Sequence, residues 1–356
     1  MNINIDISLL NNYFTNKTKK PEKAEKVEKK EKTQSKIRAY NFFSINEINI
    51  GNIINKIPYK SNYYDIMIDY DFIDIGKIGK NMIENVQLNN NKQYIISHYN
   101  NEKYIDFQDF LFNNPNKKQF LLNILNSYSK ILTSLIALND KNVFFFDLNT
   151  YNIVFLENSM PILQNFQNGL IISELNESYI KQIIENTEIY TYKSLEVHVL
   201  FYLIINEQET LSFSFIECIC ENYVKNMYVL NLFSQKYKDS YEKECVETLK
   251  KYINVPKSEI INDILKYYKY WDNYSLTIIY LHIFGNISRF FSLKNTFINK
   301  FTLILTKNIH PNPLKRETLK ETNQKYHKLF NEFTDWSFIN DVSNEKLQNL
   351  YDFLLN

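Results

Sequence analysis

Asp147 and Asn152 have the spacing in this chain that is most suggestive of catalytic chemistry. They begin and end the polar stretch DLNTYN, which lies between the apolar runs 144–146 and 153–155. Asp and Asn favour turns through local side-chain hydrogen bonds, so one interpretation is a simple hairpin turn. The other is a phosphoryl-transfer loop, in which the Asp faces a substrate hydroxyl and the Asn five residues later faces a metal ion.

Further polar residues follow this stretch in a definite order. They are Asn165-Phe166-Gln167, Ser194-Leu195-Glu196, Asp272-Asn273-Tyr274-Ser275-Leu276 and Pro313-Leu314-Lys315-Arg316. Each of these short stretches is weak when taken alone, and Asn is common throughout the sequence. The ordered set is more specific, because chance rarely supplies all of its members in sequence.

The elements that must position these residues follow from hydrophobic periodicity. Residues 117–139 predict a long helix, because Leu121, Leu125, Leu132 and further apolar residues lie on one stripe. The other expected elements are helices at 46–57 and from 104, strands at 63–75, 93–99 and 160–166, and two short strands around the polar turn. The pattern after residue 175 is mainly helical, so we expect a small mixed part followed by a larger helical part.

This order of elements and polar residues resembles that of the eukaryotic protein kinase family. More narrowly, it is similar to the divergent kinase-like proteins of large (giant) DNA viruses, and the resemblance covers residues 45–325. The catalytic loop of the family, His-Arg-Asp-Leu-Lys-x-x-Asn, corresponds here to FFDLNTYN (145–152). The resemblance implies that Asp147 is the catalytic base and that Asn152 and Asn165 occupy the metal-binding positions.

The resemblance also implies three structural residues and a two-lobed fold. Glu196 and Arg316 correspond to a buried ion pair, and Asp272 to the residue that holds the backbone of the catalytic loop. The fold class expected is α+β, with a reduced small lobe at 40–103 and a mainly helical large lobe at 104–356. The large lobe carries an insertion, residues 199–270, which forms either a surface for a partner or simply a thicker lobe.

The N-terminal residues 1–39 are expected to be a disordered segment and a charged linker. Residues 16–36 are almost entirely charged or polar and cannot bury enough apolar surface to fold alone, so they form a linker or a fraying helix. The preceding apolar segment, residues 1–14, could dock on the main domain or on a partner, or remain a loosely ordered terminus.

Several residues depart from the pattern of the family. Gly76-Lys77-Ile78-Gly79 is the nearest approach to a Gly-rich loop, and no strand of the Val-Ala-Ile-Lys type is found. Glu47 could be the ion-pairing Glu of the small lobe, but no partner Lys is visible. The available cations are Lys56, Lys60, Lys77 and Lys80, and we expect each of them to be solvated.

The departures in the large lobe remove charge from the expected reaction site. Asn165 stands where the family has a metal-binding Asp, and Mg²⁺ prefers carboxylates. Asn149 replaces the Lys that would face the transferred phosphate. Phe145 and Phe146 replace the His and Arg, and that Arg normally meets a phosphate on the activation loop.

Composition narrows the possible settings for this protein. The net charge is +1 over 356 residues, so no global field favours nucleic acid or a membrane surface, and no apolar run approaches a transmembrane length. We find no pattern of a signal peptide. The sequence has three cysteines, Cys218, Cys220 and Cys245, and this odd number indicates an intracellular, reducing compartment. If the protein is viral, that compartment is the host cytoplasm or the virion. The cysteines make a poor zinc site.

Three functions follow from these residues. The first is Ser/Thr protein kinase activity, with ATP and Mg²⁺ as cofactors and a protein substrate. The second is a pseudokinase that binds a protein partner after losing catalysis. The third is a virion-associated structural protein. Asp147 favours the first function, whereas the missing Lys, the missing Gly-rich loop and Asn165 favour the second; the set of Glu196, Asp272 and Arg316 is compatible with both.

Overall fold

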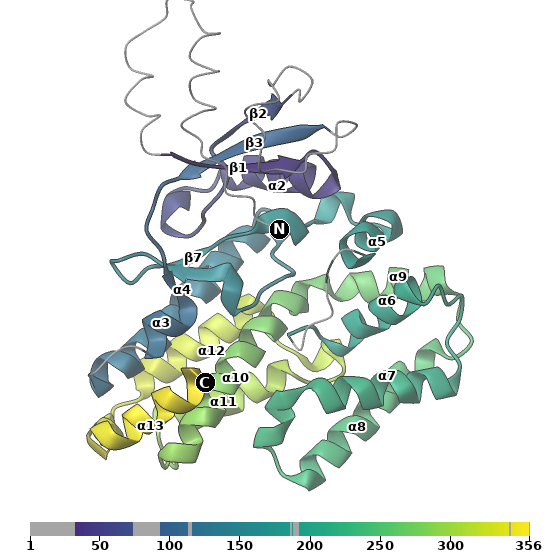
Figure 1. The fold of residues 1–356 in the computed structure, drawn as a ribbon. Helices are drawn as coiled ribbons and strands as arrows, with labels where there is room; N and C mark the ends of the chain where they lie inside the picture. The colour runs from purple at the N-terminus through teal and green to yellow at the C-terminus, as the bar shows by residue number, and fades with distance from the viewer. Residues whose placement is uncertain are drawn as a thin grey trace, which may run out of the picture. The chain divides into compact units, whose positions relative to one another are not determined.

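The computed structural model describes residues 33–73, 93–112, 116–185, 187, 192–341 and 343–355, and the fold is α+β. The chain divides into two compact units (Figure 1). The first unit contains Met1–Lys103 and Gln164–Gln167, and the second contains Tyr104–Leu163 and Asn168–Asn356. Each candidate site residue except Asn165 therefore belongs to the second unit.

The first unit contains a three-stranded antiparallel sheet with the strand order β1-β3-β2. These strands are β1 (Thr33–Ala39), β3 (Tyr94–Asn100) and β2 (Asp69–Ile73). The central strand β3 buries Ile95 and Tyr99, against which Ile48 of helix α2 (Phe42–Ile54) packs. Successive residues of β3 point to opposite faces of the sheet, and on the other face Tyr94 and Ile96 pack with Ile73 of β2, so β3 is buried on both faces.

Three sequence predictions for this unit were wrong in their bounds. Residues 33–39 were expected to belong to the disordered N-terminal segment, but they form β1 because all seven residues pair with β3. The helix predicted at 46–57 begins earlier, since the side chain of Asn41 caps it in a reciprocal box with Ser44. The strand predicted at 63–75 is shorter and spans only Asp69–Ile73.

The second unit is mainly helical. Its helices are α3 (Phe107–Phe112), α4 (Lys117–Asn139), α5 (Glu177–Glu185), α6 (Leu195–Ile205), α7 (Phe213–Asn226), α8 (Gln235–Leu249), α9 (Lys257–Ile264), α10 (Trp271–Phe290), α11 (Phe297–Asn308), α12 (Leu319–Glu332) and α13 (Asn344–Leu355). Two small antiparallel sheets complete it: β4 (Ile105–Asp106), β6 (Ile153–Phe155) and β7 (Pro161–Leu163), and β5 (Val143–Phe144) with β8 (Leu170–Ile171).

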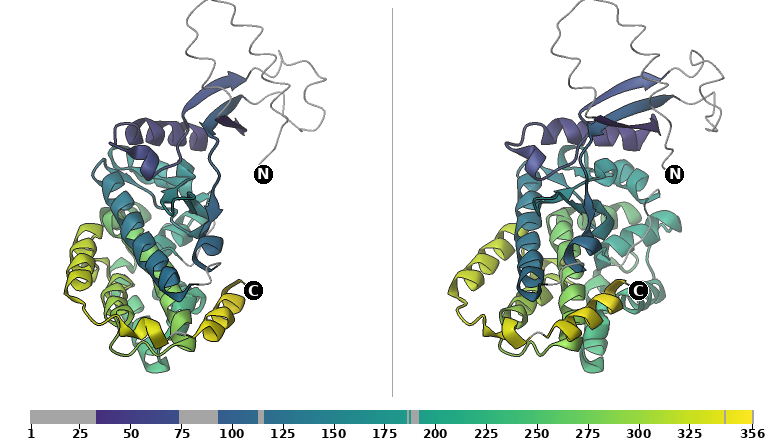
Figure 2. Two further views of the ribbon diagram at one scale, coloured as in Figure 1. Left: turned by 90° about the vertical axis from the view of Figure 1, so that its left-hand side faces the viewer. Right: turned by 60° about the vertical axis from the view of Figure 1, so that its left-hand side comes forward.

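Helix α10 forms the centre of the second unit and packs on α4, α11 and α13 (Figure 2). Tyr128 of α4 contacts the rings of Tyr280, Phe301 and Tyr326, which come from three other helices. By length and hydropathy alone α4 could cross a membrane, but 61% of the relevant window is buried inside the unit. Its position in the core accounts for its apolar composition.

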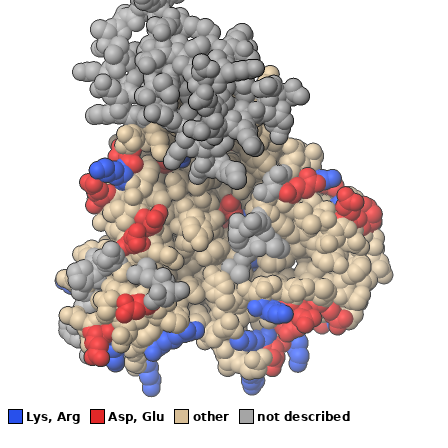
Figure 3. All heavy atoms as spheres, viewed as in Figure 1, with Lys and Arg blue, Asp and Glu red and all other residues tan. Residues whose placement is uncertain are grey.

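The predicted insertion, residues 199–270, is joined to the core by buried tyrosines. The hydroxyl of Tyr223 on α7 lies 2.5 Å from that of Tyr274 on α10, and the hydroxyl of Tyr241 on α8 donates to the carbonyl of Ile309 at 2.6 Å. On the face drawn in Figure 3, acidic and basic side chains are mixed at the lower right, where Figure 1 places α7 and α8. The inner side of the insertion therefore thickens the unit, and its outer side carries charges of both signs.

Candidate functional site

The loop that carries Asp147 is not a hairpin. Strand β5 pairs with β8, whereas β6 pairs with β4 and β7, so the two strands that flank the loop belong to different sheets. Within the loop, the side-chain oxygen of Asn149 accepts hydrogen bonds from the backbone of Tyr151 and Asn152. The amide nitrogen of Asn152 donates to the carbonyl of Asp147 at 2.8 Å, and that of Asn149 donates to the same carbonyl at 3.0 Å.

Asp272 holds the start of this loop from the first turn of α10. Its two carboxylate oxygens accept the backbone N–H groups of Phe145 at 2.9 Å and Phe146 at 2.7 Å. The side chain is fully buried, and burial raises the pKa of Asp272 to about 6, although the two N–H donors oppose that rise. The two backbone N–H donors favour the charged form of this buried carboxylate, which holds both of them.

Phe146 adopts a left-handed backbone conformation with φ 61°. Such a conformation costs about 1–3 kcal/mol in a non-Gly residue and persists only where the surroundings enforce it. Here the hydrogen bond to Asp272 fixes the backbone, and the ring packs on Trp271 with centroids 5.4 Å apart. This strain immediately precedes Asp147, which fixes the direction in which that side chain leaves the loop.

Both carboxylate oxygens of Asp147 are engaged by other side chains. The Nζ of Lys193 lies 3.2 Å from Oδ1, and the Nδ2 of Asn168 donates to Oδ2 at 3.0 Å. Lys193 also donates to the carbonyl of Phe146 and lies over its ring, 3.9 Å from the centroid. The side chains of Lys193 and Asp147 are 3% and 13% exposed, so this is a largely buried ion pair.

Burial lowers the pKa of Lys193 below its usual value, and the negative charge of Asp147 opposes that shift. Sequence reasoning missed both Lys193 and Asn168. Lys193 is 46 residues from Asp147, and no regular spacing links the two. Asn168 lies three residues beyond Asn165, but an additional Asn carries little information in so Asn-rich a sequence.

In the structure, Glu196 and Arg316 form a buried, bidentate ion pair. The guanidinium nitrogens of Arg316 lie 2.7 and 2.9 Å from the two carboxylate oxygens of Glu196, and the side chains are 1% and 4% exposed. The indole nitrogen of Trp271 donates to the same carboxylate at 3.0 Å. Arg316 also donates to the carbonyls of His310 and Pro311, so both charges are well hydrogen-bonded.

The residues at the expected metal positions do not fit Mg²⁺. Asn152 is neutral and uses its amide nitrogen within the loop, and Asn165, also neutral, belongs to the first unit. Within the described ranges, no group of three or more His, Cys, Asp or Glu side chains could hold a metal ion. Mg²⁺ sites in kinases depend on carboxylates together with phosphate oxygens, and this donor set supplies none of those carboxylates.

The first unit contains an ion pair that sequence reasoning did not identify. Arg38 of β1 pairs with Glu47 of α2, and the hydroxyl of Tyr99 donates to the same carboxylate at 2.9 Å. The missing partner of Glu47 is therefore an Arg on the preceding strand, in the segment that we expected to be disordered. Lys60 is part-exposed and donates to Asn55, whereas Lys77 and Lys80 lie outside the described residues.

His198 of α6 predicts that the free energy of unfolding of this protein depends on pH. Burial, with a contribution from the charge of Lys193, lowers the pKa of His198 to about 4. An unfolded His takes up a proton near pH 6.5, so the unfolded state binds more protons below that pH, and the free energy of unfolding falls as pH drops from 6.5 to 4. We expect a loss of about 2–3 kcal/mol from this residue by pH 4.5.

Urea denaturation at pH 7.5 and pH 4.5 measures this effect. His198→Phe retains a ring for packing on Tyr223, whose ring lies 4.9 Å away, and should lose less stability on acidification than the wild type. The exposed His327 supplies the matched variant, His327→Phe, which should keep the full acid sensitivity. An equal loss of stability in the wild type and in His198→Phe would contradict the prediction.

No family model and no curated protein matches this chain.

Proposed function

We propose that this chain is a protein-kinase-like protein that retains the framework of a catalytic loop but has lost phosphoryl transfer, and that it acts by binding a protein partner. The observation that carries the proposal is the engagement of Asp147. Both of its carboxylate oxygens are held by other side chains, one of them the buried ammonium of Lys193.

A catalytic base needs a carboxylate that can reach the proton of a substrate hydroxyl, at about 2.6–3.2 Å between heavy atoms. The carboxylate of Asp147 instead offsets the charge of Lys193, which would otherwise be buried and unpaired. Phosphoryl transfer relies almost entirely on positioning and on stabilising the developing charge. Neutral Asn149 and Asn165 stand at two positions where the family has a charged residue, the Lys that faces the transferred phosphate and the metal-binding Asp, whereas Asn152 matches the family.

The framework itself supports a kinase-like fold. Asp272 binds the loop backbone, and the pair of Glu196 and Arg316 links the start of α6 to the segment before α12. In the first unit, the pairing of Arg38 with Glu47 resembles the family's strand-to-helix Lys–Glu pair, with Arg in place of Lys. Arg is the better partner for a buried carboxylate, because its planar guanidinium binds in two-pronged geometry.

The second candidate function is an active Ser/Thr protein kinase that uses ATP. Asp147 is retained at the base position. Its backbone carbonyl accepts a hydrogen bond from the side-chain amide of Asn152, so the loop keeps a compact shape. In this alternative, Lys193 would supply the cation that is missing at Asn149, and Asp147 would exchange its bond to Lys193 for one to the substrate hydroxyl.

Thermal melting with ATP distinguishes the two functions. A ligand at 100 times its Kd stabilises the folded state by about 2.7 kcal/mol, which is visible as a rise in Tm. We expect Mg²⁺ or Mn²⁺ to add nothing to any shift that ATP produces in EDTA. A metal-dependent shift that is lost in Asn152→Ala, but kept in the exposed control Asn262→Ala, would favour the active kinase instead.

A further inference from the structure

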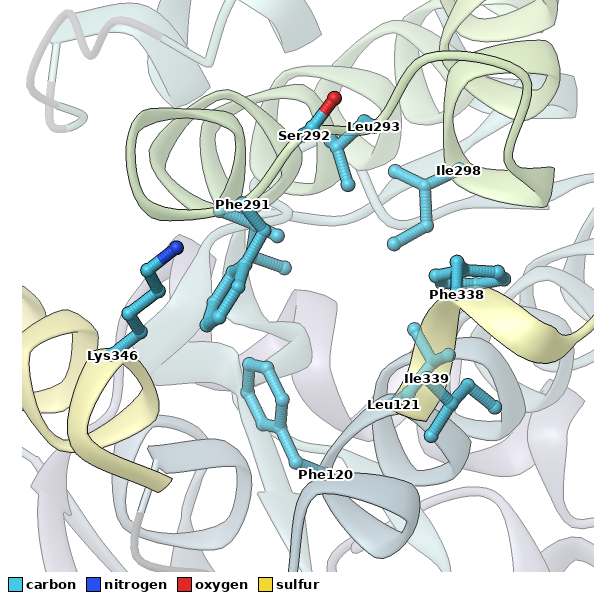
Figure 4. Close-up of a pocket in the computed structure, with 10 residues that line it drawn as sticks. Phe120, Leu121, Phe291, Ser292, Leu293, Ile298, Phe338, Ile339 and Lys346 are labelled. Carbon is cyan, nitrogen blue, oxygen red and sulfur yellow. The ribbon is translucent and has the colours of Figure 1, made fainter. Parts of the chain in front are cut away.

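An apolar cavity lies in the second unit, away from Asp147 in the sequence and built by other elements. Its volume is about 170 Å³, and it is bounded by the N-terminal part of α4, the end of α10, α11, the segment Ser337–Asp341 and α13 (Figure 4). Its walls include Phe120, Leu121, Ile287, Phe291, Ile298 and Phe338.

The cavity reaches from the interior of the unit to its surface, where Ser292 and Lys346 are exposed. Phe120, Leu121 and Ile298 are each less than a tenth exposed, so they belong to the interior. Protein interiors hold few voids larger than a water molecule, and the free energy of unfolding falls as cavity volume rises. An apolar cavity of about 150 Å³ stays dry and takes up benzene, so a space of this size and lining suits a hydrocarbon group.

A single cation stands at the edge of this apolar space. Lys346 of α13 is the one charged residue among the described residues that line it, and Figure 4 shows its amino end beside Phe291. Within the described part of the chain, its ammonium group makes no hydrogen bond or ion pair. The hydroxyl of Ser292 points away from the cavity, so Lys346 is the polar group placed to meet a ligand.

We propose that this cavity binds the hydrocarbon chain of a medium-chain carboxylic acid, with the carboxylate at Lys346. The apolar walls exclude a polar ligand, because its groups would lose their hydrogen bonds to water without replacement. The cation selects an anionic head over a neutral one. Each added methylene that enters the cavity should strengthen binding about fourfold, until the chain fills the space.

Isothermal titration calorimetry on the full chain tests this proposal with hexanoate, octanoate and 1-octanol. Octanoate should bind saturably and more tightly than hexanoate. Lys346→Gln should raise the Kd for octanoate about two- to fivefold, which is the range for an exposed ion pair, and leave the Kd for 1-octanol unchanged. The control Lys328→Gln removes another exposed lysine, 74% exposed on α12, and should leave octanoate binding unchanged.

A cavity-filling variant gives a second test. Leu121→Phe adds a ring to the wall of the cavity and should raise the Kd for octanoate at least tenfold. Absence of saturable octanoate binding to the wild type would overturn the proposal. So would equal octanoate affinity in Lys346→Gln and the wild type, a result that does not depend on whether Leu121→Phe folds.

Discussion

Arg316→Ala is expected to lower the free energy of unfolding by about 3–5 kcal/mol, because it leaves the carboxylate of Glu196 buried and without its ionic partner. The two side chains are 1% and 4% exposed, so water cannot replace the lost guanidinium. Trp271 would remain as a neutral donor, which is too weak to offset a buried charge. Urea denaturation followed by circular dichroism measures the loss.

The neighbouring Lys315→Ala is the matched control. Lys315 pairs with Glu244 on the surface, where its side chain is 57% exposed, and such pairs contribute about 0–1 kcal/mol. The double variant Glu196→Ala/Arg316→Ala should lose less stability than the sum of the two single losses, because it removes both charges together. If Arg316→Ala unfolds at the same urea concentration as Lys315→Ala, the ion pair does not exist in solution.

Asp272→Ala is expected to lower the free energy of unfolding by about 2–6 kcal/mol. The reason is that it leaves two buried N–H groups without a hydrogen-bond acceptor, and each such group costs about 1–3 kcal/mol. These donors belong to Phe145 and Phe146. Without these two hydrogen bonds, the left-handed conformation of Phe146 depends on its contacts with Lys193 and Trp271, so the loop that carries Asp147 should loosen as well. Urea denaturation gives the global loss.

Amide hydrogen exchange reports the local effect. In Asp272→Ala, the amides of Phe145 and Phe146 should exchange faster than the change in global stability explains. Asp140→Ala is the control, because Asp140 is an exposed carboxylate of the same unit that pairs with Lys320. Unchanged protection of the two Phe amides in Asp272→Ala would show that the carboxylate does not hold the loop.

Much of the second unit could be predicted from local patterns. The stripe of Leu residues in 117–139 marks α4, because a helix that faces the core repeats its apolar residues with a period near 3.6. The polar residues Asp272, Glu196 and Arg316 could be singled out because their short motifs follow one another in the order that resembles the kinase family. The structure places all three in contact with the partners that the resemblance implied.

Other features could not be read from the sequence, because they depend on distant segments. β1 has a charged, weakly alternating sequence and becomes a strand through pairing with β3, more than 50 residues later. Nothing in the local sequence distinguishes Lys193 from a surface lysine, but in the structure it is buried against Asp147. Arg38 was hidden for the same reason, since only the sheet brings it beside Glu47.

The claim that phosphoryl transfer has been lost is tested most directly by an assay with radiolabelled ATP, Mg²⁺ or Mn²⁺ and general protein substrates. Wild type and Asp147→Asn are compared for label on substrate, label on the protein itself, and conversion of ATP to ADP. We predict that wild type does not exceed Asp147→Asn in any of the three. Transfer or hydrolysis by wild type that Asp147→Asn abolishes, while remaining folded by circular dichroism, would contradict the claim and establish an active kinase.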